Sequence, residues 1–184
     1  MSDVLQKDHA SARARRVRLM AFDVDGVLTD GSLYYTDQGI EIKAFNTLDG
    51  HGLKMLQQAG ITVAIITGRS SRCVELRAQN LGIRHLFQAV DDKLEVMNTL
   101  LAELNLEAND AGYMGDDLPD LPVMMACGFS ATPGDSHVLV QRHALFTSRR
   151  GGGRGAVREV CEFILEAQGK LAGTLAPYMT MAGR

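Results

Sequence analysis

The stretch FDVDGVLTDG, residues 22–31, decides the fold, because two carboxylates directly follow a short apolar run. Residues 19–22 read LMAF, which is typical of a buried parallel strand, and Gly26 interrupts the pattern. Side chains two apart on a strand point the same way, so Asp23 and Asp25 would leave the sheet edge together. Open α/β sheets bind their ligands at this carboxyl end of the strands. We therefore expect a functional site there.

The Asp23 and Asp25 pair also indicates a metal ion. Two adjacent carboxylates repel each other and are costly to desolvate unless a cation lies between them. Mg²⁺ takes oxygen ligands and would remove that cost. The pair therefore predicts a magnesium site at the end of the first strand.

Composition favours one compact domain. The chain has 184 residues, of which 46% are hydrophobic and 22% charged, so it can bury one sizeable core. A net charge of -3 argues against a dedicated nucleic-acid binder. Cys73, Cys127 and Cys161 are scattered, which favours reduced core thiols and a cytoplasmic location over a disulfide framework. No apolar stretch reaches the ~18 residues of a membrane span, so we expect no membrane partner.

The amino terminus carries four arginines before the first apolar run. Because Asp23 and Asp25 interrupt that run, it is too short for a signal peptide. We interpret residues 1–17 as a flexible solvated arm, 18–171 as a single domain and 172–184 as a carboxyl-terminal tail.

Short apolar strands alternate with helical patterns along the domain. This alternation predicts an α/β fold, a doubly wound parallel sheet with helices on both faces. The expected strands are 18–23, 62–66, 85–88, 111–114, 128–131 and a possible last one at 144–146. The expected helices are 50–59, 71–81, 93–104, 118–126, 137–141 and 156–170.

Between residues 31 and 45 the apolar period changes to two. Ile40 and Ile42 alternate with Glu41 and Lys43, and the turn residues 37–39 separate them from a strand at 33–36. This pattern predicts a protruding β-hairpin. A lone hairpin is marginally stable, so its apolar face must lie on the body or on another subunit. The chain inserts no cap domain, and we favour association with other copies.

Three later segments carry further polar motifs in or beside apolar runs. Residues 65–69 read IITGR, Lys93 follows two aspartates at the head of a helical pattern, and residues 115–120 read GDDLPD. Together with residues 23–29, these four motifs resemble, in order, those of the haloacid dehalogenase superfamily of phosphatases. A single match would be weak, whereas four in order are a strong signal.

Two more segments narrow the resemblance. Residues 49–56, DGHGLKML, and 151–161, GGGRGAVREVC, resemble one branch of that family, the 3-deoxy-D-manno-octulosonate 8-phosphate (KDO 8-phosphate) phosphatases. The likeness runs from about Leu19 to Gly169. His51 departs from it, because a Tyr is common there in the family, and this affects local packing or a secondary substrate contact. The resemblance implies a homotetramer without cap domains, in which the hairpins associate.

The resemblance implies a catalytic role for each motif. Asp23 is the nucleophile that forms an aspartyl-phosphate, and Asp25 is the general acid and base. Phosphoryl transfer depends on positioning and charge neutralisation, which Thr67, the Gly68 amide and Lys93 supply. The expected Mg²⁺ ligands are the Asp23 carboxylate, the Asp25 main-chain carbonyl and Asp116, while Asp117 and Asp120 orient waters or Lys93 from outside the ligand set.

A second set of positions matches those that bind the sugar acid in the family. A substrate with a carboxylate and several hydroxyls suits their mixture of guanidinium, ammonium and amide groups. The expected substrate-binding residues are Asn46, Thr47, Leu48, Asp49, Gly50, Lys54, Arg69 and Arg77, in addition to Asp25, Thr67, Gly68 and Lys93.

Structural interpretations stand beside these functional ones. The aspartates at 116, 117 and 120 could merely cap a helix beginning near Leu118. Lys93 alone could be a solvated helix residue, and Arg69, Arg77 and Lys54 could each be exposed. Residues 151–153 could be a flexible linker, or residues 149–154 an arm that reaches a neighbouring subunit's site.

The function predicted from these motifs is Mg²⁺-dependent hydrolysis of KDO 8-phosphate in lipopolysaccharide precursor synthesis. Two alternatives stay open. The substrate could be a nine-carbon phosphate of the sialic-acid type, or the domain could be a non-catalytic oligomerising or regulatory module. Intact Asp23, Asp25, Thr67, Lys93 and Asp116 count against the second.

Overall fold

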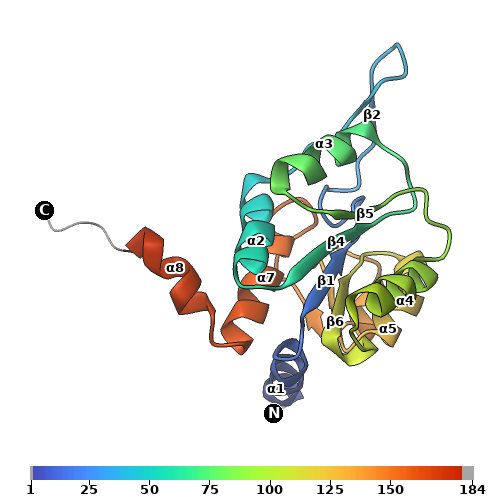
Figure 1. The fold of residues 1–184 in the computed structure, drawn as a ribbon. Helices are drawn as coiled ribbons and strands as arrows, with labels where there is room; N and C mark the ends of the chain where they lie inside the picture. The colour runs from blue at the N-terminus through green and yellow to red at the C-terminus, as the bar shows by residue number, and fades with distance from the viewer. Residues whose placement is uncertain (1, 180–184) are drawn as a thin grey trace, which may run out of the picture.

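The computed structural model describes the backbone of residues 2–179 and the side chains from residue 7 onward. Its centre is a six-stranded parallel sheet with strand order β5-β4-β1-β6-β7-β8 (Figure 1). The strands are β1 (Leu19–Phe22), β4 (Thr62–Ile66), β5 (His85–Phe87), β6 (Ala111–Met114), β7 (Phe129–Thr132) and β8 (Phe146–Thr147). The predicted parallel α/β fold is confirmed.

Helices cover both faces of the sheet. One face carries α1 (Ser2–Ala14), α2 (Thr47–Gln58), α3 (Arg72–Leu81) and α7 (Ala156–Ala167). The other carries α4 (Lys93–Leu104), α5 (Leu121–Ala126) and α6 (Val138–His143). Short 3-10 turns, η1 (Ala108–Asp110) and η2 (Leu118–Asp120), precede β6 and α5. The doubly wound arrangement follows from burial of apolar side chains on each face.

Strand β1 shows why the sheet needs both helical layers. Met20 and Phe22 belong to the hydrophobic cluster under α2 and α7, whereas Leu19 and Ala21 belong to the cluster under α4 and α5. All four side chains are fully buried. Alternate residues of a strand face opposite sides, so an uninterrupted apolar run indicates a strand covered on both faces.

Most element boundaries lie within three residues of those expected from the sequence. The helix expected at 118–126 is divided, because η2 precedes α5 and each carries a Pro in its first turn. The helix expected at 156–170 ends at Ala167, before Gly169, whose φ of 68° is left-handed. Helix α2 begins earlier than expected, at Thr47, because the Asn46 side chain accepts a hydrogen bond from the Leu48 amide.

The amino-terminal segment differs from the flexible arm expected for residues 1–17. Residues 2–14 form α1, and Ala10 and Ala14 are buried in the cluster shared with α7. Gln168 also donates hydrogen bonds to the carbonyl oxygens of Ala14 and Val17. Small side chains four residues apart allow close helix packing, a signal that the arginines of this segment obscured.

The expected carboxyl-terminal tail contains a helix. Helix α8 (Leu171–Met179) extends away from the body (Figure 1) and buries none of its residues. Residues 180–184 of that tail lie outside the described part of the chain. His51 of α2 contacts α8, because its ring meets that of Tyr178 edge-on at a centroid distance of 5.5 Å. The unusual His51 is thus a packing residue in this structure.

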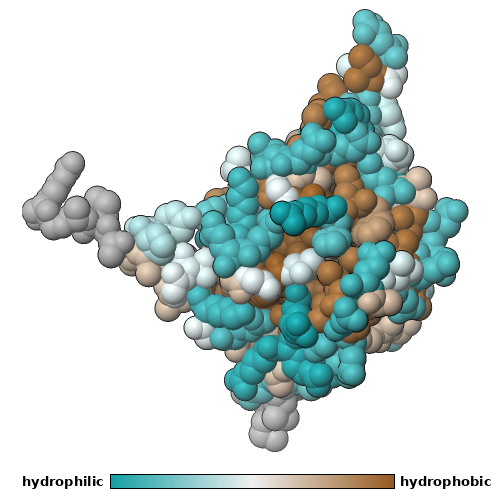
Figure 2. Space-filling view, viewed as in Figure 1, coloured by the Kyte–Doolittle hydropathy of each residue, from teal (hydrophilic) through white to brown (hydrophobic). Residues whose placement is uncertain are grey.

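The predicted β-hairpin is present. Strands β2 (Tyr34–Tyr35) and β3 (Glu41–Ile42) pair in antiparallel fashion and project from the body (Figure 1). Between β1 and β4 the chain inserts only this hairpin and α2. Figure 2 shows apolar residues along the projection below a hydrophilic tip, and the exposed set is Leu33, Tyr34, Tyr35, Ile40 and Ile42. Among the described helices, none combines the length and apolarity needed to cross a membrane.

Candidate active site

The candidate site lies where the strand order reverses. From β1 the chain adds β4 and β5 on one side and then returns to add β6 on the other, so the loops after these strands diverge at one point. They line a pocket of about 370 Å³. The pocket residues are Asp23, Asp25, Thr67, Gly68, Arg69, Val90, Asp91, Lys93, Asp116, Asp117, Pro119 and Asp120. Residues from all four sequence motifs are therefore brought together.

Lys93 is a buried cation between two carboxylates. Its Nζ lies 2.6 Å from Asp120 Oδ1 and 3.1 Å from Asp23 Oδ2. The two acidic neighbours raise the pKa of Lys93 despite its burial, so it remains charged. The structure therefore excludes the interpretation of Lys93 as a solvated helix residue.

Asp120 holds several groups of the site in place. Its Oδ2 accepts hydrogen bonds from the backbone amides of Asp116 and Asp117, at 3.0 and 3.2 Å. Its Oδ1 lies 3.0 Å from the hydroxyl of Tyr113, a buried β6 residue absent from the sequence-based site. Because both oxygens are occupied, Asp120 fixes Lys93 and the acidic loop, in the supporting position expected from the sequence.

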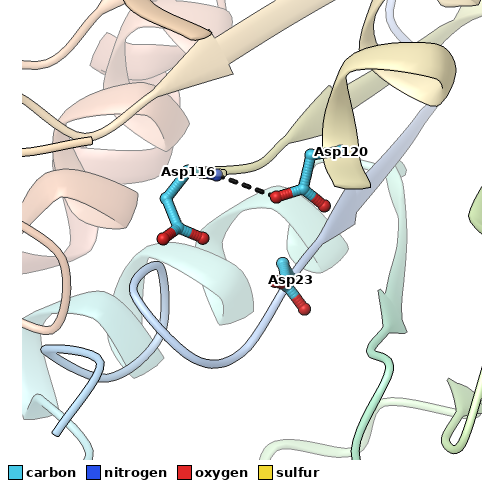
Figure 3. Close-up of side chains that lie close together, drawn as sticks. All are labelled: Asp23, Asp116 and Asp120. Atoms are coloured by element: carbon cyan, nitrogen blue, oxygen red, sulfur yellow. Dashed lines mark hydrogen bonds between the residues drawn. The ribbon is translucent and has the colours of Figure 1, made fainter. Parts of the chain in front are cut away.

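Asp23, Asp116 and Asp120 offer carboxylate oxygens within 4.8 Å of one another (Figure 3). Asp23 Oδ1 and Asp116 Oδ1 are buried and have no hydrogen-bond partner among the described residues. Burial and the neighbouring carboxylates raise the pKa of Asp23 to about 6 and that of Asp116 to about 8. Unpartnered anionic oxygens in a half-buried cluster fit a divalent cation, whose charge would offset their repulsion.

The loop after β1 is shaped by Gly26. Its φ of 88° is left-handed, and a Cβ there would lie 2.1 Å from the Asp116 carboxylate. The amides of Val27, Leu28 and Thr29 then donate to the Val24 carbonyl and close a tight turn. Glycine is therefore required for Asp23 and Asp116 to approach each other.

Residues 151–153 pack against this loop instead of forming the flexible linker considered from the sequence. The Gly153 amide donates to the Val27 carbonyl at 2.9 Å, and the Gly152 amide donates to Asp135 Oδ1 at 3.0 Å. A Cβ on Gly152 would lie 1.9 Å from the Gly26 carbonyl oxygen. These glycines thus permit close contact between two backbones, a packing role that the sequence pattern did not reveal.

Asp25 stands at the outer wall of the pocket and meets two cations. Its Oδ1 accepts a hydrogen bond from Lys43 Nζ of the hairpin, and its Oδ2 lies 3.5 Å from Arg69 Nε. Arg69 Nη2 also donates to Glu41 Oε1 and to the Tyr35 hydroxyl, both at 2.8 Å. None of Lys43, Glu41 and Tyr35 belongs to the site predicted from the sequence, although the hairpin's period of two places Glu41 and Lys43 on one face.

Several expected substrate-binding residues lie away from this pocket. Arg77 donates to the Asn46 carbonyl at 3.0 Å, and its guanidinium lies over the Phe45 ring at 5.7 Å. Asp49 is 1% exposed and accepts hydrogen bonds from the Gly155 and Arg158 amides at the start of α7. The expected substrate-binding residues that do not line this pocket are Asn46, Thr47, Leu48, Asp49, Gly50, Lys54 and Arg77.

Comparisons with known proteins agree with this geometry. A family model described as haloacid dehalogenase-like hydrolase matches residues 41–129. The chain is 49% identical over 166 residues to the 3-deoxy-D-manno-octulosonate 8-phosphate phosphatase KdsC of Yersinia pestis, covering 90% of this chain and 89% of the relative.

Two solved structures are similar over nearly their whole length. A probable YrbI family phosphatase from Pseudomonas syringae pv. phaseolica has a TM-score of 0.92 at 49% identity, covering 96% of this chain and 99% of that one. The 3-deoxy-D-manno-octulosonate 8-phosphate phosphatase of Moraxella catarrhalis, solved with magnesium, phosphate and KDO, has a TM-score of 0.92 at 42% identity, covering 94% and 99%. By sequence and by fold, this chain belongs to the haloacid dehalogenase-like hydrolases, in the family of the 3-deoxy-D-manno-octulosonate 8-phosphate phosphatases.

Proposed function

We propose that this chain is a Mg²⁺-dependent phosphatase that hydrolyses KDO 8-phosphate to KDO and inorganic phosphate. The observation that carries the proposal is the buried Lys93, 3.1 Å from Asp23, beside unpartnered oxygens of Asp23 and Asp116. A nucleophilic carboxylate, a fixed cation and a divalent-ion site are what phosphoryl transfer requires. The relatives' names supply the sugar acid.

Asp23 is the nucleophile of the proposed reaction. Its carboxylate attacks phosphorus in line, the bond from phosphorus to the sugar oxygen breaks, and an aspartyl-phosphate forms. Lys93 neutralises charge on the phosphoryl oxygens from its fixed place between Asp23 and Asp120. The Thr67 side chain and the Gly68 amide, at the end of β4, donate hydrogen bonds to the same oxygens.

Asp25 acts on the leaving group and then on water. In the first step the protonated Asp25 carboxyl gives its proton to the departing sugar oxygen and becomes a carboxylate, and in the second that carboxylate accepts a proton from the water that attacks the aspartyl-phosphate. The second step releases phosphate and restores the Asp23 carboxylate. Its half-buried position at the pocket wall lets it face a leaving group that approaches from the hairpin side.

The Mg²⁺ ligands in this proposal are the Asp23 carboxylate, the Asp25 main-chain carbonyl and Asp116. The bound ion supplies charge neutralisation for the carboxylates and the phosphoryl oxygens. Asp120 holds the amides of Asp116 and Asp117 and therefore keeps the acidic loop in register. Asp117, which is exposed, faces the solvent side of the loop and would orient waters.

Arg69 is the residue best placed for the substrate carboxylate. Its side chain is 43% exposed at the pocket rim, and its guanidinium already contacts the carboxylates of Asp25 and Glu41. A guanidinium binds a carboxylate through paired hydrogen bonds. The pocket is open on this side, so a nine-carbon sugar acid remains the second candidate substrate.

We further propose a cytoplasmic enzyme of lipopolysaccharide precursor synthesis that assembles as a homotetramer. Five exposed apolar side chains on the hairpin support association with other copies, because water-exposed clusters of this kind mark contact surfaces. The cysteines are unpaired, and Cys127 and Cys161 are buried, which suits a reducing compartment. The contacts of Asp23 and Lys93 argue against the non-catalytic alternative.

Phosphate release from a panel of esters tests the proposal. The panel contains KDO 8-phosphate, a nine-carbon sialic-acid-type phosphate and p-nitrophenyl phosphate, each assayed with Mg²⁺. We expect the highest kcat/KM for KDO 8-phosphate. Equal values for the sugar acids and the small ester would instead identify a general phosphatase, and no release from any ester would favour a non-catalytic module.

A further inference from the structure

The hairpin strand β3 and the residues beside it present two chemically different faces. Ile40 and Ile42 point outward and are 58% and 52% exposed. Glu41 and Lys43, which alternate with them, turn toward the pocket and contact Asp25 and Arg69. The same period of two that leaves an apolar surface for other copies therefore directs two charged side chains at the active site of the chain's own domain.

Lys43 is the more deeply enclosed of the two. Its side chain is only 2% exposed, and its Nζ donates to Asp25 Oδ1 and lies 3.5 Å from Glu41 Oε1. A lysine is rarely enclosed unless it is paired, and here both partners are carboxylates. Lys43 lies on the hairpin, outside both hydrophobic clusters.

Glu41 fastens the hairpin to the body. Its Oε1 accepts from Arg69, and its Oε2 accepts from the Ser71 hydroxyl just before α3. The Ser71 amide in turn donates to the Gln88 side chain, which follows β5. Glu41 thus links the hairpin to two loops of the sheet edge, and this attachment sets the position from which Lys43 reaches Asp25.

We propose that Lys43 is a positioning residue that holds the Asp25 carboxylate for its encounter with the leaving oxygen, and that Glu41 fixes the hairpin so that Lys43 can do so. This inference rests on the proposed function, in which Asp25 protonates the sugar oxygen. A carboxylate with one oxygen held by Lys43 and the other near Arg69 loses rotational freedom. Such preorganisation contributes to catalysis because small displacements of a reacting group are costly.

The leaving group provides a direct test. The oxygen of a sugar needs a proton as it departs, whereas p-nitrophenolate leaves readily without one. We would measure single-turnover formation of the phosphoenzyme with Mg²⁺ for both esters, in the unchanged protein and in Lys43→Met. Lys170→Met is the matched control, because Lys170 is exposed and its Nζ donates to the Ala59 carbonyl oxygen, away from the pocket lining.

We expect Lys43→Met to slow the reaction of KDO 8-phosphate about 100-fold, the cost of misplacing a reacting group, while p-nitrophenyl phosphate reacts almost as before. Asp25→Asn should show the same selectivity for the leaving group. Equal losses with both esters would reduce Lys43 to a structural residue, and an unchanged rate with KDO 8-phosphate would also overturn the inference.

A second variant, Glu41→Gln, tests the inference if Lys43→Met does not fold. Glu41→Gln keeps the size of the side chain but weakens its bonds to Arg69 and Ser71, so it should show the same split between esters to a smaller degree. Circular dichroism would establish that each variant is folded. If the unchanged protein turned over neither ester, the proposed function would fail, a result distinct from an unselective Lys43 variant.

Discussion

The two ends of the pocket are built in opposite ways. At the phosphate end, Asp23 and Thr67 are buried and follow β1 and β4, each of which pairs with a strand on both sides, and the buried Lys93 begins α4. At the rim, Arg69 is 43% exposed and is held by side chains of a hairpin with two residues in each strand. The first end is fixed by the core, and the second by a few polar contacts between long side chains.

This difference separates chemistry from recognition. Phosphoryl transfer needs groups fixed to within a fraction of an ångström, and strand ends supply that precision. In the proposed function, recognition of a sugar acid needs reach and charge at a greater distance from phosphorus, which the exposed Arg69 and the hairpin would supply. Substitutions at the two ends should therefore fail differently, at the chemical step or in substrate discrimination.

The largest effect is expected at the nucleophile. Asp23→Asn should abolish phosphate release, because the amide fits the same space but cannot attack phosphorus. The sheet and its hydrophobic clusters should be retained, since the apolar side chains of β1 pack into the clusters on both faces of the sheet. Phosphate release and circular dichroism would be measured together. Near-normal turnover by the folded variant would refute the aspartyl-phosphate mechanism and would show that Asp23 is not the nucleophile.

Metal removal should have a comparable effect on turnover. Chelation should abolish activity, Mg²⁺ should restore it and Ca²⁺ should inhibit, because Ca²⁺ accepts looser geometry. Mg²⁺ at 100 times its Kd should stabilise the folded state by about 2.7 kcal/mol, which thermal unfolding would detect. Asp116→Asn should lose most of that stabilisation, and Asp37→Asn, at an exposed position outside the pocket lining, serves as the control. Full activity in chelator would contradict the metal site.

The sequence was informative at the phosphate end because its signals are local. A strand that ends in Asp23, or a helix that begins at Lys93, can be recognised from a few neighbouring residues. Parallel strands then bring these ends to one edge without further information. The fold, the meeting of the four motifs at one pocket and the supporting place of Asp120 could all be predicted in this way.

Apart from the presence of Arg69, the contacts at the rim could not be predicted, because they depend on how distant segments meet. The contact of Lys43 with Asp25 depends on the angle at which the hairpin leaves the body, and no local pattern encodes that angle. The family resemblance implied a substrate contact for Arg77, and the sequence did not reveal that α3 places its guanidinium over Phe45. The packing of Gly152 on Gly26 likewise depends on how the segment after β8 meets the loop after β1.

At the rim, Arg69→Met should mainly reduce discrimination. Hydrogen bonds to charged groups are worth about 1.5–3 kcal/mol, so kcat/KM for KDO 8-phosphate should fall roughly 10- to 100-fold. The value for p-nitrophenyl phosphate, which lacks a carboxylate, should change little. Arg72→Met is the control, since Arg72 is exposed, pairs with Glu75 and lies outside the pocket lining. Parallel losses for both esters would mean that Arg69 belongs to the chemical end.

The outer face of the hairpin should control assembly. The double substitution Ile40→Glu and Ile42→Glu would bury unpaired charge in any apolar contact between copies, so the proposed homotetramer should dissociate. Turnover should then fall less than in Asp23→Asn, because the charged face of the hairpin remains. Sedimentation would give the oligomeric state, with Asp37→Asn at the hydrophilic tip as control. A monomeric unchanged protein would refute the proposed assembly.

The smallest effect on turnover is expected at Arg77. Its substitution tests whether the part of the pocket that recognises substrate extends as far as α3. Its guanidinium donates to the Asn46 carbonyl and covers Phe45, so Arg77→Met should cost about 1 kcal/mol of stability. Because Arg77 lies outside the pocket lining, kcat/KM should stay unchanged for KDO 8-phosphate and for p-nitrophenyl phosphate. Thermal unfolding and kinetics of one preparation would separate the two quantities. A selective loss with KDO 8-phosphate would show that the sugar reaches α3, and the recognition end of the pocket would then extend from the hairpin to the start of α2.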